Sequence, residues 1–224
     1  MQINTLDEFL QKYIEGYLFG DLNSVHDIVP IADDSNASYL MLSGLCAGIE
    51  FLGYLTGRDY TVENGRISTA HAFEDYCSEY LSPIDSRYEV FGTIGKKLIR
   101  NGIMHNFATK GIIGVTRRGD RDDTHLVRYT DEGVIIINPE YLLEDFKKSY
   151  FEDVVDRLRN DQIMRHRANR NYVALRDQDA EEITRTLRRV SGGMSNWPWL
   201  YRSIPTNDET TELIEQNGNL PIVS

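Results

Sequence analysis

Apolar residues recur every three or four positions along most of the chain, which is the spacing of a buried stripe on a helix. The first such stretch covers residues 4–19, and the second and most apolar covers residues 36–56. Gly20 is suited to cap the first helix, and an acidic connector around Pro30 is expected between the two. The same spacing predicts a third helix over residues 68–81.

A fourth helix is predicted over about residues 86–104, and it contains Gly92, Gly95 and Gly102. Each glycine costs about 1 kcal/mol relative to alanine in a helix interior. Close packing against another helix is the simplest gain that offsets this cost. The neighbour could belong to the same chain or to a symmetric partner. We therefore expect a homodimer that packs through this helix and through residues 36–56.

The period changes after residue 107. Three short runs rich in β-branched residues follow, at residues 112–116, 124–129 and 134–137. A charged turn at residues 117–123 and a tight turn at residues 131–133 separate them. The pattern predicts a three-stranded antiparallel β meander, inserted between helices at about residues 111–138.

The tripeptide Asn138-Pro139-Glu140 predicts a helix start, because asparagine is a good N-cap and proline suits the first helical position. This helix should run to about Arg159. Two arginine-rich helices, residues 161–176 and 178–190, are expected next. The polar residues 206–224 predict a loosely ordered tail after a single mainly α domain over residues 1–205.

Composition limits the class of protein. The chain has 224 residues, 41% of them apolar, which suits one compact domain or a domain with a small appendage. No apolar run approaches the roughly 20 residues that span a bilayer, so no membrane association is expected. The first nine residues include Asp7 and Glu8 and lack the basic start of a secretory signal. Cys46 and Cys77 show no CxxC spacing, which is typical of reduced thiols in a cytoplasmic protein.

Charge is distributed unevenly along the chain. The net charge is -11, and residues 1–90 alone carry four basic and fifteen acidic side chains. Residues 157–189 carry nine arginines and five acids. Such a segment forms either a salt-bridged, solvated face or a surface that steers RNA. A polyanion would be repelled by the first part of the chain and tolerated only by the second.

The candidate functional residues lie in the stretch K-L-I-R-N-G-I-M-H-N-F, residues 97–107. Four pairs in the chain place a histidine five to seven residues after an arginine: Arg66/His71, Arg100/His105, Arg118/His125 and Arg159/His166. Only Arg100/His105 ends a long glycine-containing apolar helix and has an asparagine, Asn101, directly after the arginine. Arg100, Asn101 and His105 are therefore the predicted catalytic residues, and no residues are assigned to substrate binding.

This stretch resembles the motif of the HEPN superfamily, in which an arginine, often followed by a polar residue, precedes a histidine by four to six positions. HEPN domains are helical bundles and typically dimers. Many are metal-independent endoribonucleases of toxin, abortive-infection and RNA-surveillance systems, and others have lost catalysis and serve as binding modules. The resemblance covers about residues 36–107. It implies a toxin, stress or defence effector with an RNA substrate and an antitoxin or another protein partner.

The residue types suit RNA cleavage without a metal or cofactor. His105, with an ordinary pKa near 6.5, can transfer the proton of the 2′-OH or of the leaving oxygen. Arg100 offers a planar fork to the phosphate, and Asn101 can orient either group by hydrogen bonds. The five histidines show no metal-binding spacing with cysteine or carboxylate, so no metal is predicted.

Two alternatives remain open. On an ideal helix Arg100 and His105 are about 140° apart, so they converge only if the helix ends near Gly102 or a second copy supplies its own pair. Otherwise both residues simply complement the dipole at a helix C-terminus. The second function is a catalytically inactive HEPN-like dimer that binds a nucleotide or a protein as a scaffold. The acidic surface favours this function, whereas the intact Arg-Asn-His set favours cleavage.

Overall fold

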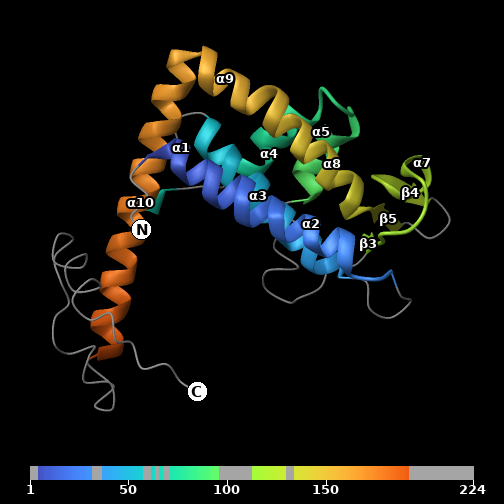
Figure 1. Ribbon diagram of the computed structural model, residues 1–224, viewed down its shortest axis with the longest axis horizontal. Helices are drawn as coiled ribbons and strands as arrows, with labels where there is room; N and C mark the ends of the chain where they lie inside the picture. The colour runs from blue at the N-terminus through green and yellow to red at the C-terminus, as the bar shows by residue number, and fades with distance from the viewer. Residues whose placement is uncertain are drawn as a thin grey trace. The chain divides into compact units, whose positions relative to one another are not determined.

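The structure is a computed structural model, shown in Figure 1. It describes residues 5–31, 37–57, 62–63, 66–67, 71–95, 113–129 and 134–191. Helices dominate these residues and a small sheet accompanies them, so the predicted mainly α fold is confirmed. The contacts separate the chain into two compact units, Met1–Tyr172 and Val173–Ser224. The predicted tail and the predicted domain end at residue 205 lie outside the described residues.

The N-terminal helix consists of three consecutive segments: α1 (Leu6–Phe9), the π-helical η1 (Leu10–Leu18) and α2 (Phe19–Ile28). Thr5 begins it with a capping box. The Thr5 hydroxyl accepts a hydrogen bond from the Glu8 amide at 3.2 Å, and the Glu8 carboxylate accepts one from the Thr5 amide at 3.3 Å. The helix ends at Val29, directly before Pro30.

Gly20 does not end this helix, so its predicted role as a C-terminal cap is wrong. Phe19 and Leu22 are both buried, and Phe19 packs edge-on against the ring of Phe146. Because these residues are buried on the core face, the helix continues past the glycine. A Cβ at Gly20 would meet no atom within 4 Å, so this glycine faces open space.

The central helix of the core is α3, and it corresponds to the prediction for residues 36–56. It spans Ser38–Thr56 and packs against α2, against α4 (Ala72–Tyr76) and against α8 (Pro139–Ser149). Its glycines permit this close packing. A Cβ at Gly53 would overlap the carbonyl group of Ala72, and one at Gly48 would crowd the ring of Phe146.

By length and composition alone, α3 could cross a membrane, which corrects the expectation that no apolar run approaches that length. However, 61% of its apolar window is buried inside the protein. Met41, Leu45 and Leu52 of this helix have no exposed surface. Such burial is that of the core helix of a soluble protein.

Helices α4 and α5 form the pair that the glycine pattern anticipated. Helix α4 continues into the π-helical η2 (Cys77–Leu81), and α5 spans Arg87–Ile94. A Cβ at Gly92 would lie 3.0 Å from that of Cys77, and one at Gly95 would lie 2.9 Å from the ring of Phe73. The neighbour that these glycines accommodate is therefore the same chain, so they do not require a second copy.

The predicted strands are present, and the second and third pair antiparallel as predicted. The first strand is parallel to the third, so the sheet is mixed and the predicted antiparallel meander is only partly correct. The strands are β3 (Ile113–Val115), β4 (Val127–Tyr129) and β5 (Val134–Ile137), and their order is β3-β5-β4. β5 runs parallel to β3 and antiparallel to β4. The connection between β3 and β4 contains a short helix, α7 (Arg121–Thr124), and does not form a tight turn. β5 is continuously apolar, which suits the central position. Elsewhere β1 (Val62–Glu63) pairs antiparallel with β2 (Arg66–Ile67).

After the sheet, the chain is helical as predicted from Asn138 onward. The Asn138 side chain accepts a hydrogen bond from the Glu140 amide at 3.0 Å. Helix α8 continues through the π-helical η4 (Tyr150–Val154) into α9 (Val155–Asn160). One helix, α10 (Gln162–Ser191), replaces the two predicted arginine-rich helices. Asp161 caps it by accepting hydrogen bonds from the amides of Ile163 and Met164, and neither glycine nor proline interrupts it.

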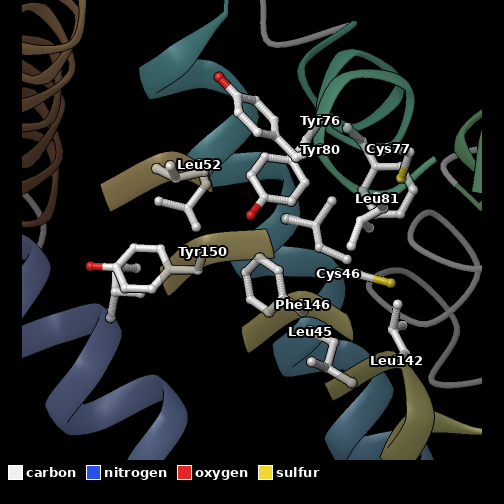
Figure 2. Close-up of a cluster of buried hydrophobic side chains, with 14 of the residues drawn as sticks. Leu45, Cys46, Leu52, Tyr76, Cys77, Tyr80, Leu81, Leu142, Phe146 and Tyr150 are labelled. Carbon is white, nitrogen blue, oxygen red and sulfur yellow. The ribbon is translucent and has the colours of Figure 1, made fainter. Parts of the chain in front are cut away.

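An aromatic cluster fills the core between α3, η2 and α8, as Figure 2 shows. The ring of Tyr76 packs edge-on against Phe146, and its hydroxyl is 2.9 Å from that of Ser149. Cys46 and Cys77 lie in the same region as free, buried thiols. Burial raises the pKa of the Cys77 thiol well above its ordinary value, so this thiol stays protonated.

Candidate functional site

The predicted catalytic residues Arg100, Asn101 and His105 lie outside the described residues, in the segment 96–112. The described neighbours of that segment are Gly95 at the end of α5 and Ile113 at the start of β3. Ile113 is buried in the core. Both ends of the candidate segment are therefore joined to packed elements. The contacts that fix α5 and the sheet also fix the two points at which this segment is attached.

A buried polar network ties the start of α5 to helix α8 and to the segment before β4. The Tyr88 hydroxyl donates a hydrogen bond of 2.7 Å to Oδ2 of Asp145. The same hydroxyl lies 2.8 Å from Nε2 of His125. Tyr88 and His125 have no exposed surface, and Asp145 is 4% exposed.

Arg121 of α7 neutralises the buried carboxylate of this network. Its guanidinium donates two hydrogen bonds to Asp145, of 2.8 Å and 2.7 Å, in the bidentate geometry that arginine favours. The guanidinium also lies over the ring of Tyr141, 5.1 Å from its centroid. A buried charge is tolerated when it is paired and hydrogen-bonded, and Asp145 meets both conditions.

The protons of the network can be assigned from its hydrogen bonds. Because the single proton of Tyr88 goes to Asp145, the imidazole of His125 must donate from Nε2 to the Tyr88 oxygen. Nδ1 of His125 is then a bare acceptor, and within the described part of the chain it is buried without a hydrogen-bond partner. Burial lowers the pKa of His125 to about 4, and it raises the pKa of Tyr88 well above its ordinary value. At neutral pH both groups are uncharged.

The Tyr88–His125–Asp145 network positions structural elements, because no substrate can contact side chains that are so fully buried. A second arginine supports it from outside. Arg87 donates a hydrogen bond of 2.9 Å to the carbonyl of His125, and its guanidinium also donates hydrogen bonds to the carboxylate of Asp85. The Arg87 guanidinium lowers the pKa of Asp85. These contacts fasten the segment between α7 and β4 to the start of α5.

The Arg118/His125 pair of the sequence does not form a catalytic pair in the structure. Arg118 donates to the carbonyl of Ile31 at 2.9 Å, whereas His125 faces Tyr88. The neighbouring Arg117 is 3% exposed and donates to Glu140 at 2.7 Å. The Arg117 guanidinium also donates to carbonyl groups at the C-terminal end of α2, where a cation complements the helix dipole.

Arginines of the segment 157–189 are partly engaged in ion pairs. Arg157 contacts Glu79 at 2.7 Å, Arg165 contacts Asp7 at 2.6 Å, and Arg176 contacts Asp177 at 3.1 Å. For these three residues the structure favours the interpretation as a salt-bridged face. Arg159 has no ion-pair partner in the part of the chain that the structure describes.

Sequence reasoning missed the Tyr88–His125–Asp145 network. One signal was present in the sequence: Asp145 lies three residues after Leu142 and four before Ser149, on the stripe that buries Phe146. A carboxylate on the buried stripe of a helix requires a partner. The sequence did not indicate which cation and which phenol would meet it.

No group of three or more histidine, cysteine, aspartate or glutamate side chains that could hold a metal occurs among the described residues. Comparisons with protein-family models, with curated proteins and with solved structures found no match to this chain. The functional assignment therefore rests on the residues themselves and on the fold that presents them.

Proposed function

We propose that this chain is a HEPN-like, metal-independent endoribonuclease of the toxin, stress or defence type. In this proposal His105 is the general acid and base, and Arg100 stabilises the charge that develops on the phosphate. Asn101 orients one of the two groups. The observation that carries the proposal is the sequence R-N-G-I-M-H, which begins at Arg100, six positions after Ile94, the last residue of the glycine-containing helix α5.

Two features of the described structure support the proposal. The fold is mainly α, as the resemblance implies for the helices that lead to the motif. Helix α5 is held by the packing of Gly92 and Gly95 against α4 and by the hydrogen bond between Tyr88 and Asp145. A helix that is fixed in this way is a suitable support for groups that must meet a phosphate within hydrogen-bonding distance.

Incubation of the pure protein with structured and with unstructured RNA in the presence of EDTA tests the proposal. We expect cleavage that persists in EDTA and that falls by about 10²–10⁴-fold in His105→Ala. The matched control is His71→Ala, because Arg66 and His71 have the same spacing as the candidate pair and His71 is exposed. Wild-type protein that leaves all RNA intact, or equal loss of cleavage in both variants, would contradict the assignment.

A specific observation favours the second function, a catalytically inactive HEPN-like dimer that binds a nucleotide or a protein partner. Arg87, Arg117, Arg121, Arg157 and Arg165 are each paired with a carboxylate of the same chain. Paired guanidinium groups add little attraction for RNA, and residues 1–90 are acidic. Binding of RNA or of a protein partner without cleavage, by a protein that sediments as a dimer, would support this function.

A further inference from the structure

A pocket of about 310 Å³ lies in the unit Met1–Tyr172, and no residue of the Tyr88–His125–Asp145 network lines it. Its walls come from the N-terminal helix, from the segment η4–α9 and from the start of α10. Leu10 and Leu158 are buried and form an apolar floor together with Val155. The volume lies at the lower end of the range of small-molecule sites, and these three residues are the apolar part of a lining that is otherwise polar or charged.

Two π-helical segments border this pocket. η1 contributes Leu10, Gln11 and Glu15, and η4 contributes Tyr150. π-Helical turns are rare and occur frequently at functional sites. The Tyr150 hydroxyl donates a hydrogen bond of 3.0 Å to Glu15 and so joins the two segments at the pocket wall.

Four charged side chains line the pocket: two of them pair with each other, and the other two, Glu15 and Arg159, do not pair with an opposite charge among the described residues. Asp7 and Arg165 form an ion pair of 2.6 Å, so their charges cancel. Among the described residues, the hydrogen-bond donor to Glu15 is the phenol of Tyr150, which is neutral because burial and then the Glu15 carboxylate raise the pKa of Tyr150. Arg159 has no ion-pair partner among the described residues, and it lies near enough to oppose the effect of Glu15 on that pKa. One carboxylate and one guanidinium therefore border the same apolar floor.

We propose that this pocket binds a small zwitterion of the α-amino acid class with an apolar side chain. The ligand carboxylate pairs with Arg159 and the ligand ammonium pairs with Glu15. The apolar side chain covers Leu10, Val155 and Leu158. A simple anion would leave the Glu15 carboxylate facing it, and a cation would face Arg159, so only a ligand with both charges satisfies both groups. This site does not depend on the proposed RNA-cleaving residues.

Isothermal titration and thermal shift of the full chain with L-leucine and L-phenylalanine test the proposal. N-acetyl-L-phenylalanine, which lacks the ammonium charge, and L-phenylalaninamide, which lacks the carboxylate, are the matched ligands. We expect both analogues to bind about tenfold more weakly than L-phenylalanine or worse, because each loses one charge-assisted hydrogen bond. No binding of either amino acid at millimolar concentration, or equal binding of the analogues, would overturn the proposal.

Two variants test the assigned residues. Arg159→Gln and Glu15→Gln should each weaken L-phenylalanine binding by about tenfold or more, and the glutamine at position 15 can still accept the Tyr150 hydrogen bond. Arg176→Gln is the control, because its guanidinium contacts Asp177 and does not line the pocket. Circular dichroism establishes that each variant is folded. Undiminished binding in either pocket variant would refute the recognition of a zwitterion.

Discussion

Tyr88 and Asp145 are joined by a hydrogen bond of 2.7 Å although 57 positions separate them in sequence. Neither side chain has an appreciable exposed surface. The bond connects the start of α5 with the middle of α8, and it lets His125 donate to the Tyr88 oxygen in turn. One phenol thereby pairs with a buried carboxylate and with Nε2 of a buried imidazole.

Removing this hydroxyl should destabilise the protein. In Tyr88→Phe the Nε2–H of His125 loses its acceptor in a buried site, while Asp145 keeps Arg121. We expect the free energy of unfolding to fall by about 1–3 kcal/mol. Urea denaturation measures this change. Tyr141→Phe is the matched control, since its hydroxyl donates only a 3.2 Å bond to the exposed Gly119 carbonyl, and a comparable loss there would contradict the prediction.

The buried neutral His125 predicts loss of stability in mild acid. Its pKa is about 4 in the folded protein and near 6.5 when unfolded, so the unfolded chain binds more protons between these values. The stability contributed by the neutral imidazole is complete above pH 6.5 and is lost as the pH falls toward 4. The loss is at most about 3 kcal/mol.

Urea denaturation at a series of pH values checks this window. His125→Gln can still donate to the Tyr88 oxygen but does not titrate, so its unfolding free energy should fall less than that of the wild type between pH 6.5 and pH 4. Carboxylates that titrate in the same range affect both proteins and cancel in the difference. Parallel curves for the two proteins would show that His125 does not cause the acid sensitivity.

Alanine substitution should change the stability of the protein in opposite directions at two helical glycines. Gly20 faces open space, so Gly20→Ala should stabilise the protein by about 0.5–1 kcal/mol through helix propensity. Gly53 lies against the backbone of Ala72, so Gly53→Ala should destabilise it by about 1–3 kcal/mol or more. Melting temperatures of the two variants measure the effects. A stable Gly53→Ala protein would mean that α3 and α4 can separate without cost.

Arg100→Lys distinguishes a catalytic arginine from a helix-end charge. Lysine keeps the positive charge but loses the planar fork that binds two phosphate oxygens. In the proposed ribonuclease this variant should lose most of its cleavage activity in EDTA with an unchanged melting temperature. If Arg100 only complements a helix dipole, Arg100→Lys should be silent in both measurements, and His105→Ala should cost about 0.3–1 kcal/mol of stability when the imidazole is charged.

Local chemistry predicted the elements of this fold well. The helix start at Asn138 depends on one side chain and the proline after it, and the capped helix is present as expected. Gly92 and Gly95 required a close neighbour in any compact arrangement, and α4 is that neighbour. The runs rich in β-branched residues contain the strands that were predicted. Their periodicity can be recognised within a few residues, without knowledge of the rest of the fold.

The pairing of distant segments was decided only by the tertiary structure. β5 lies between β3 and β4 because strand order depends on the length of the connection and on which strand is buried, and neither appears in a local pattern. Gly20 lies within a helix because the core buries Phe19 and Leu22 on either side of it. Asp145 stood out as a carboxylate on an apolar stripe, but its partners Tyr88 and Arg121 come from elements far away in sequence. A buried charge requires a partner, but only the packing of the helices determines which side chains can reach it.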